Sequence, residues 1–463
     1  MKQAQVKQTH GAGRAFCRVL VLAGAWLACG CAHFRPLSLP GGAGRDLSPE
    51  TVAEIRMRAA DIRHPILRPL AIDLTDGLSP DEAGVFAVLA NPSLRAVRDA
   101  RQLAAAQSLQ AGLLPNPRIS AGYGTPIAGD SPGDVNPYGF GVDWDVTSLI
   151  ARSSKLESAG ERQASVDLDI AWQEWQVAQS AKMTVWRIVA LEKQVALARD
   201  AAGVLAEQRQ ILEHAVDRGS STGPALAAAK AASRQIRRSR LELEKQLAAR
   251  RLELNRLLGL APSAELVVAT PNLPTRFEPP SKSSLSREIE RRRPDLLALR
   301  RGYQSQQAAV RAAILGQFPK IDIGVVHDRD SDNIKTAGFQ VGIDLPVFDR
   351  NQGRIAAERA TRQKLRDEYA DRVFRARSDV AMLCGGIGFL NRQIAELRDA
   401  NADFQNLADT YARALKAGRA DAMAAFDARI RLAENRRNEI ASRGQLAEAI
   451  CALELASGIY QLR

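Results

Sequence analysis

The stretch RPDLLALRRGYQSQQAAVRAAILGQFPKIDIGVVHDRDSDNIKTAGFQVGIDLPVFDRNQGR, residues Arg293–Arg354, decides the fold of this chain. A polar helix breaks at Pro319 and is followed by two short strands, Lys320–His327 and Phe339–Leu345, and then by a second helix. In both strands apolar residues alternate with small or polar ones, and an acidic loop, Asp328–Thr336, joins them. One apolar face opposite one polar face is what a strand needs when it separates lipid from water.

This unit occurs twice in the chain. The helix start Arg293-Pro294-Asp295-Leu296 has a counterpart at Asn91-Pro92-Ser93-Leu94, and the segment Gly338–Leu345 has one at Gly139–Val146, each about 200 residues earlier. A shorter alternating strand around Ile119 completes the first pair. The sequence therefore predicts two strands in each half of the chain.

A very long helix is predicted after each strand pair, from Ala151 to about Asp217 and from Asn351 to about Ala417. At 1.5 Å per residue, ~65 residues extend about 100 Å. Each helix then turns sharply and runs back as a second helix. The turns are at Arg218–Pro224 and Ala417–Asp421, and the return helices at Ala225–Leu258 and Ala422–Tyr460.

The N-terminus has the pattern of an export signal, with basic residues before the short apolar core Val19–Ala28. The next residues resemble a bacterial lipoprotein signal, which implies lipidation of Cys31. Cys29 is a less suitable alternative, and ordinary signal cleavage is another. The expected segments are a signal peptide at 1–30, a lipidated extended linker at 31–65, a first repeat at 66–265, a proline-rich linker at 266–282 and a second repeat at 283–463.

The net charge of +12 over 463 residues does not indicate a nucleic-acid partner, because Lys and Arg are interleaved with Asp and Glu along helical stretches. The five histidines lack metal-ligand spacing, and neither a nucleophile elbow nor a phosphate loop occurs. We therefore expect no enzymatic activity, no cofactor and no metal site.

Four strands cannot close a barrel with a lumen, and an open sheet edge cannot lie in lipid. Other copies of the chain must therefore complete the sheet in a closed ring. Two copies would supply about 8 strands, whose side chains nearly fill the interior, whereas three copies supply about 12 and leave a passage. The expected fold is a mixed α and β membrane protein, a trimeric 12-stranded β-barrel with a periplasmic α-helical tunnel.

The RPDL helix start, the FPKI break, the GFQVGIDLPVFDRNQGR segment and the tandem repeat resemble the TolC-type outer-membrane efflux proteins, in particular the lipoprotein branch that includes heavy-metal efflux components. The resemblance runs from about Asn91 to the C-terminus. It implies a lipid-anchored homotrimer in the outer membrane, with a periplasmic adaptor (membrane fusion protein) and an inner-membrane pump of the RND type as partners. The implied function is a passive exit duct of a tripartite efflux system, whose cargo, heavy-metal cations or drugs, stays open.

A second class of function fits part of the same pattern. A lipid-anchored periplasmic coiled-coil adaptor or scaffold would also carry a long helical hairpin. Such a protein would have one hairpin flanked by soluble β-domains and no lipid-facing strands, whereas this sequence predicts four strands with one apolar face each.

The resemblance implies roles for the hairpin tips. Gly219 and Gly418, flanked by Arg218 and Arg419, match the family's adaptor-docking turns, although glycines would cap helices there in any case. The first tip departs from the family pattern, because it carries Pro224 and lacks the usual aspartate.

The resemblance also implies a periplasmic gate just past the second tip. Asp427 matches one gating acidic residue and Asp421 lies nearby, whereas the other gating position is Ala424. Three copies of Asp427 would form a constriction that attracts cations. The alternative is a solvated aspartate on a helix surface.

Cys384 and Cys451 lie at equal distances from the second turn, so two antiparallel helices would bring them level. In the oxidising periplasm a disulfide would form if both side chains faced inward. The alternative is two small, buried apolar residues.

Overall fold

The computed structural model describes residues 34–39, 44–128, 135–219, 221–416 and 422–460. The chain divides into two units, Met1–Ala43 and Gly44–Arg463. In the first unit the described residues, 34–39, form neither helix nor strand. The predicted signal peptide and the predicted lipidation site, Cys31, lie outside the described residues.

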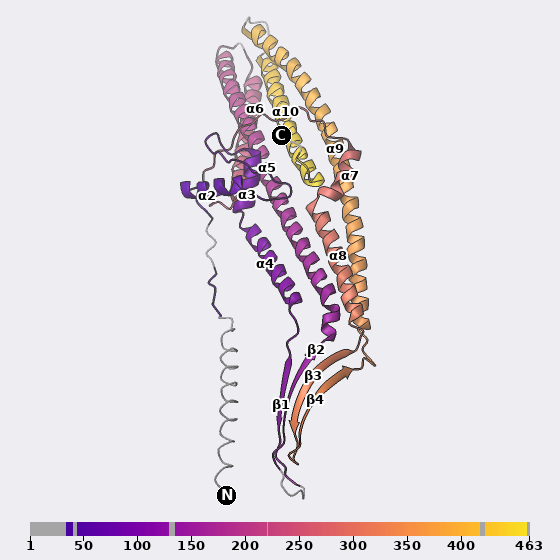
Figure 1. Cartoon of the computed structure of the whole chain (residues 1–463). Coiled ribbons are helices and arrows are strands. Elements are labelled where there is room, and N and C mark those ends of the chain that lie inside the picture. The colour runs from indigo at the N-terminus through magenta and orange to yellow at the C-terminus, as the bar shows by residue number, and fades with distance from the viewer. Residues whose placement is uncertain (1–33, 40–43, 129–134, 220, 417–421, 461–463) are drawn as a thin grey trace, which may run out of the picture. The chain divides into compact units, whose positions relative to one another are not determined.

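The second unit contains the predicted tandem repeat: in each half a helix, two strands, a very long helix and a return helix (Figure 1). The first repeat consists of α4 (Ser93–Gly112), β1 (Arg118–Tyr123), β2 (Tyr138–Asp145), α5 (Thr147–Asp217) and α6 (Gly223–Leu257). The second consists of α8 (Pro294–Leu315), β3 (Lys320–Arg329), β4 (Lys335–Asp344), α9 (Gln352–Lys416) and α10 (Ala422–Ser457). The long helices α5 and α9 have 71 and 65 residues, so the predicted repeat of strand pair and helical hairpin is confirmed.

Two boundaries differ from the prediction. Helix α8 ends before Pro319, which was expected to break it, because the helix already stops at Leu315 and Gly316 caps it. The loop predicted at Asp328–Thr336 is shorter, since the ladder between β3 and β4 continues to the pair Arg329 and Lys335. Asn333, with a φ of 73°, makes the tight turn that this longer ladder requires.

Three short helices accompany the repeats: α2 (Pro49–Ala60), α3 (Pro80–Ala90) and α7 (Lys282–Arg292). The extended linker predicted at 31–65 is wrong over α2. Ser48 caps this helix by accepting a hydrogen bond from the Thr51 amide at 3.2 Å, and Pro49 occupies its first turn. Ile55 and Ala59 are then buried on one face, which stabilises the helix.

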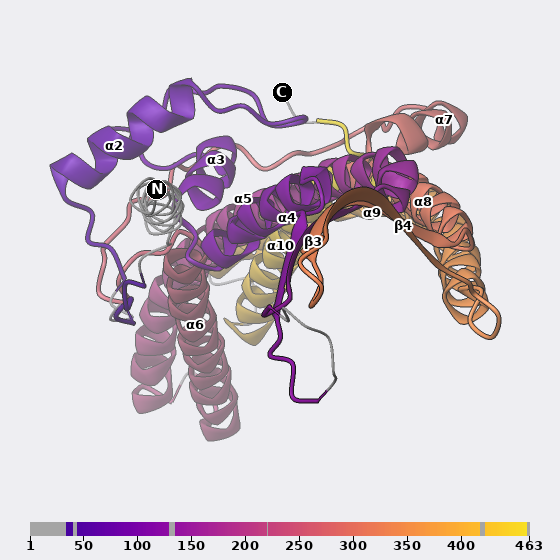
Figure 2. The same cartoon turned by 60° about the horizontal axis from the view of Figure 1, so that its bottom comes forward.

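The four strands form one antiparallel sheet in the order β1-β2-β3-β4 (Figure 1), and Figure 2 shows the bend of β3 and β4. The two repeats meet at its centre, where Val142 of β2 lies opposite Val325 of β3. The strands lie at one end of the unit, and the far ends of α5 and α9, with the starts of α6 and α10, lie at the other (Figure 1). Of the helices described, none is both long enough and apolar enough to cross a bilayer.

The two largest of the five apolar cores among the described residues lie between the helices. The first joins α2, α3, α5, α6 and α10, and includes Phe86, Val185 and Leu258. The second joins α7, α9 and α10, and includes Ile289 and Val380. Helices of this length derive their stability from packing rather than from local propensity, so the cores hold the unit together at mid-length.

Candidate functional site

One face of the sheet is apolar and exposed. The register places Ile119, Val142, Val325 and Phe339 opposite one another, in one row across all four strands. Their exposed fractions are 75%, 42%, 52% and 92%. A contiguous apolar patch of this kind is an aggregation site in water, and it suits a hydrocarbon environment.

The opposite face of the sheet is polar and built around glycine. Its central row is Arg118, Asp143, Gly324 and Gln340. A Cβ atom at Gly324 would collide with the Asp143 carboxylate, so the absence of a side chain there lets the acid lie flat over the neighbouring strand. This arrangement leaves charged groups on the face opposite the apolar one.

The outer strands β1 and β4 each have a single partner strand within the described chain. Their other edges present backbone donors and acceptors that no strand of the described chain pairs. Water satisfies such an edge, but hydrocarbon does not. The sheet is therefore incomplete for a membrane.

Side-chain hydrogen bonds fasten the strands to the helices. The Thr147 hydroxyl at the start of α5 donates to the Pro319 carbonyl at 3.2 Å and accepts from the Ile321 amide at 2.6 Å. Near α9, the Asn351 amide donates to the Ala313 carbonyl at 2.7 Å. The two bonds of Thr147 join the first repeat to the second, so residues of the second repeat hold the start of α5.

The first hairpin tip is a tight turn. Helix α5 ends at Asp217, and Gly219 adopts a φ of 72°, which glycine accommodates without strain. Thr222 begins α6 by accepting a hydrogen bond from the Ala225 amide at 3.4 Å. Arg218 is exposed, and its guanidinium donates to the His214 carbonyl of its own helix at 3.2 Å. Both residues predicted at this tip are thus at its surface.

The second tip is described only from its flanks, since Gly418, Arg419 and Asp421 lie outside the described residues. Asp427 is on α10, with 57% of its side chain exposed. Its carboxylate accepts a hydrogen bond from Arg431 Nε at 2.7 Å, one turn further along the helix. This bond raises the pKa of Arg431. Sequence inspection did not identify Arg431, although its i, i+4 spacing to Asp427 was the available signal.

Cys384 and Cys451 are both buried and both free, which matches the alternative of two small buried residues rather than the possible disulfide. Cys384 belongs to the core that contains Val380 and Ile387, whereas Cys451 belongs to the core that contains Leu254. The two thiols therefore face different neighbours, although antiparallel helices carry them. Burial raises the pKa of both thiols.

A buried charge cluster joins the two repeats, and the sequence analysis missed it. Lys182 of α5 donates to Glu454 of α10 at 2.8 Å and lies 2.8 Å from Asp81 of α3. Lys182 and Glu454 are 1% and 0% exposed. Lys182 Nζ also lies 4.9 Å from the centre of the Tyr460 ring. The attraction of the carboxylates outweighs burial and raises the pKa of Lys182.

The two matching helix starts have the same structural role. Asn91 donates to the Leu257 carbonyl at the end of α6 at 2.9 Å, and Arg293 donates to the Ala456 carbonyl at the end of α10 at 3.1 Å. Arg293 also binds both oxygens of the buried Asp295, at 3.0 and 2.7 Å. The residue before each proline thus closes the carbonyl end of its own repeat's return helix.

In the part of the chain that the structure describes, no three His, Cys, Asp or Glu side chains gather as a metal site. The features that could carry a function are the sheet with one exposed apolar face, the two helical hairpins and the charged residues near their tips.

Comparison with known proteins agrees with this geometry. Residues 285–459 match the family model described as Outer membrane efflux protein. The cobalt-zinc-cadmium resistance protein CzcC of Cupriavidus metallidurans is 25% identical over 219 residues, 47% of this chain and 52% of CzcC. The pyoverdine export outer membrane protein OpmQ of Pseudomonas aeruginosa is 25% identical over 266 residues, 55% of this chain and 56% of OpmQ. The chain spans about half the length of these curated relatives.

Solved structures share the fold over most of the chain. CusC superimposes with a TM-score of 0.67 at 18% identity, covering 86% of this chain and 96% of CusC. The outer membrane protein VceC of Vibrio cholerae gives 0.69 at 17% identity, covering 82% of this chain and 97% of VceC. The predicted TolC-type fold of the protomer is therefore confirmed. The second repeat thus matches the outer membrane efflux protein family model, and the chain shares the fold of CusC and VceC.

Proposed function

We propose that this chain is the protomer of a trimeric outer-membrane channel, the passive exit duct of a tripartite efflux system. The observation that carries the proposal is the four-stranded sheet, which has one exposed apolar face and two outer edges that no described strand pairs. In hydrocarbon every backbone donor and acceptor needs a partner, so β1 and β4 need strands from other copies. Three copies supply about 12 strands, enough for a barrel with a passage.

The helical hairpins support the second half of the proposal. The longest of their helices, α5, has 71 residues and extends ~105 Å, so the hairpins would reach far from the bilayer. A periplasmic adaptor would dock at the tips, where Arg218 is exposed beside the tight turn at Gly219. Gly418 and Arg419 would contribute the same pair at the second tip. An inner-membrane pump of the RND type would deliver the cargo.

Asp427 is the proposed gate residue, with Asp421 beside it in sequence. Its exposure and its place in the second turn of α10 support this role. Because Arg431 pairs with Asp427, a ring of three copies would carry alternating acids and cations rather than acids alone. Such a ring would favour cations weakly.

The cargo follows from the pump rather than from this chain. The relatives CzcC and OpmQ are named for resistance to cobalt, zinc and cadmium and for pyoverdine export, which are different cargos. A duct that provides only passage serves both classes without a binding site. We therefore propose export of small polar solutes, with heavy-metal cations and drugs as the two candidate classes.

A lipid on Cys31 would anchor each copy beside the barrel, as the signal sequence suggests. Mass spectrometry of the mature N-terminal peptide tests the anchor. A diacylglyceryl and acyl adduct on Cys31 supports it, and an unmodified N-terminus contradicts it.

The adaptor or scaffold alternative does not explain the sheet. In a soluble protein, Phe339 and Ile119 would leave 92% and 75% of their surface in contact with water, which promotes aggregation. The channel and the scaffold are separated by fractionation of membranes, followed by denaturing gels with and without heating and by conductance in planar bilayers. A soluble monomer without conductance would reject the channel.

A further inference from the structure

One face of α6 carries cations without carboxylate partners. Arg234, Arg237 and Arg238 are exposed, and their spacing of three and four residues places them on one stripe of the helix. Within the described ranges, none of the three forms an ion pair or hydrogen bond. Leu241 and Leu252, 55% and 53% exposed, continue this stripe toward the end of α6. We call these five residues the α6 stripe.

One face of α9 carries the opposite charge. Glu396, Asp399 and Asp403 are exposed and lie on one stripe at the same spacing of three and four residues. Among the described residues only Asp399 forms an ion pair, with the adjacent Arg398 at 4.0 Å, and the guanidinium of Arg392 lies 5.9 Å from the ring of Phe389. Phe389, 60% exposed, extends this stripe toward the strands. We call Phe389, Glu396, Asp399 and Asp403 the α9 stripe.

The two stripes lie on opposite sides of the same unit. Helix α5 packs between α6 and α10, and α10 packs between α5 and α9. Figure 1 shows α6 and α9 on the two sides of the helical part. The stripes therefore do not neutralise each other within one chain.

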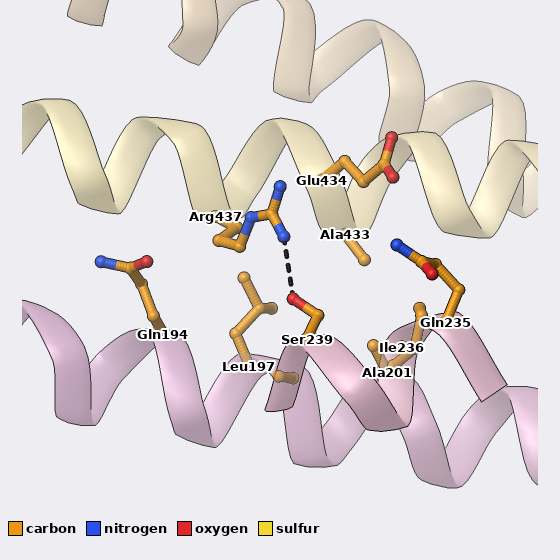
Figure 3. Close-up of a pocket in the computed structure, with 10 residues that line it drawn as sticks. Gln194, Leu197, Ala201, Gln235, Ile236, Ser239, Ala433, Glu434 and Arg437 are labelled. Atoms are coloured by element: carbon orange, nitrogen blue, oxygen red, sulfur yellow. Dashed lines mark hydrogen bonds between the residues drawn. The ribbon is translucent and has the colours of Figure 1, made fainter. Parts of the chain in front are cut away.

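The stripes also lie at the same level along the helices. Arg437 of α10 donates to the Ser239 hydroxyl of α6 at 3.0 Å (Figure 3). Two residues earlier on α10, Asn435 donates to the Asn401 side-chain oxygen of α9 at 2.9 Å. Ser239 is adjacent to Arg238 and Asn401 lies between Asp399 and Asp403, so the charged parts of the two stripes are level.

Level, complementary stripes on opposite sides are what a head-to-tail ring requires. Rotation about an axis parallel to the helices leaves the level of every residue unchanged, so one side of a copy meets the other side of the next copy at equal height. The cations of the α6 stripe would then face the acids of the α9 stripe. Leu252 and Phe389 lie about 20 Å further toward the strands on their respective helices, so they too would be level.

We propose that the α6 stripe of one copy binds the α9 stripe of the next copy, and that these charges set the register of the helical tunnel. The proposal rests on the trimeric channel proposed above and names the surfaces that close its helical part. Exposed ion pairs contribute little affinity individually, but complementary rows of charge select one register and exclude like-charged surfaces.

Cysteine cross-linking tests the contact directly. In a chain that carries Arg238→Cys and Asp399→Cys, mild oxidation of isolated membranes should give covalent dimers and trimers on a non-reducing denaturing gel, and reductant should return them to monomers. The matched control is Arg238→Cys with Asp409→Cys, since Asp409 is exposed on another face of α9 and should give monomers only. Cys384 and Cys451 are buried and present in both variants.

Charge reversal supplies an independent test. The variant R234E/R237E/R238E and the variant E396R/D399R/D403R should each lose the trimer that resists denaturant without heating, and the combined six-fold variant should regain it. If the wild type forms a conducting trimer that neither reversal weakens and that does not cross-link, the contact is wrong and the channel stands. A reversal that abolishes only adaptor binding would also overturn the contact. If the wild type forms neither a trimer nor a conducting pore, the proposed channel itself fails.

Discussion

The ammonium group of Lys182 lies 2.8 Å from the Glu454 carboxylate, and both side chains are buried between the two repeats. Gln179, also buried, donates to the same carboxylate oxygen at 3.0 Å. Lys182 comes from the first repeat and Glu454 from the second. The pair is therefore a buried polar joint between the two repeats, which also meet through apolar cores and through the ladder between β2 and β3.

Removal of one member of this pair should destabilise the fold strongly. Lys182→Ala leaves the Glu454 carboxylate buried without its cation, which costs about 3–5 kcal/mol. Thermal unfolding of the purified protein in detergent measures the loss. The double variant Lys182→Met/Glu454→Leu removes both charges and should recover most of the stability. Equal losses in the single and double variants would show that packing, not charge, holds the joint.

The residues that precede the helix-start prolines should differ in importance although they occupy matching positions. Arg293→Ala removes the bidentate partner of buried Asp295, which then keeps only Arg372 at 3.6 Å, at a cost of up to about 3–5 kcal/mol. Asn91→Ala leaves only neutral hydrogen bonds unmade, at about 1–3 kcal/mol. Arg292→Ala is the control, since Arg292 forms an exposed pair with Glu288 worth about 0–1 kcal/mol. The order Arg293, Asn91, Arg292 in melting temperature shifts checks the argument, and any other order contradicts it.

His64 should make the fold sensitive to mild acid. Its Nε2 lies 2.9 Å from the Ala171 carbonyl, and its Nδ1 accepts hydrogen bonds from the Ile66 and Leu67 amides at 3.0 and 2.9 Å, so the neutral ring fits. Burial lowers the pKa of His64 below its ordinary 6.5. The unfolded chain therefore takes up this proton first as the pH falls.

The stabilisation from neutral His64 is complete above about pH 6.5 and declines as the pH falls through the lower folded pKa. Melting temperatures measured between pH 8 and pH 5 should therefore fall below about pH 6.5. The variant His64→Asn should be less stable at pH 8 and show a flatter profile. Parallel profiles for both proteins would contradict the role of His64.

The two faces of β4 should respond differently to charge. Phe339 and Gln340 are adjacent but point to the apolar and the polar face. Phe339→Lys places a cation on the face proposed to meet lipid, at up to about 2–4 kcal/mol near the bilayer centre. Gln340→Lys is the matched control and should be tolerated. The yield of heat-modifiable trimer in membranes reports the difference, and equal yields would argue against a lipid-facing sheet.

The pair of Asp427 and Arg431 should set ion preference at the proposed gate. Asp427→Ala leaves three unpaired arginines in a ring, so it should lower the preference for cations and raise single-channel conductance. Arg431→Ala leaves three aspartates and should raise the preference for cations. Reversal potentials in a salt gradient across a planar bilayer measure both. If neither variant moves the reversal potential, the pair does not line the narrow part of the pore.

Local pattern was enough to predict most of the architecture. The period-two alternation in Lys320–His327, the long stretches without proline, and the recurrence of Asn91-Pro92 and Arg293-Pro294 depend only on neighbouring residues. Such short-range signals predict strands, helices and their repetition, because alternation and helical periodicity are properties of the backbone itself. The tips at Gly219 and the position of Asp427 followed from the same pattern with the family resemblance.

Long-range packing decided the rest. Lys182 and Asp399 are both charged residues on long helices, yet one is buried against Glu454 and the other is exposed, since neighbouring helices decide which face is covered. Packing also separates Cys384 from Cys451. The sequence predicted that the two residues lie level on neighbouring helices, but not the directions in which their side chains point. Residues 49–60 form a helix, which is stabilised because the side chain of Ile55 packs into an apolar core. The sequence by itself thus determined the elements and their repetition, and the tertiary structure decided which side of each helix is buried.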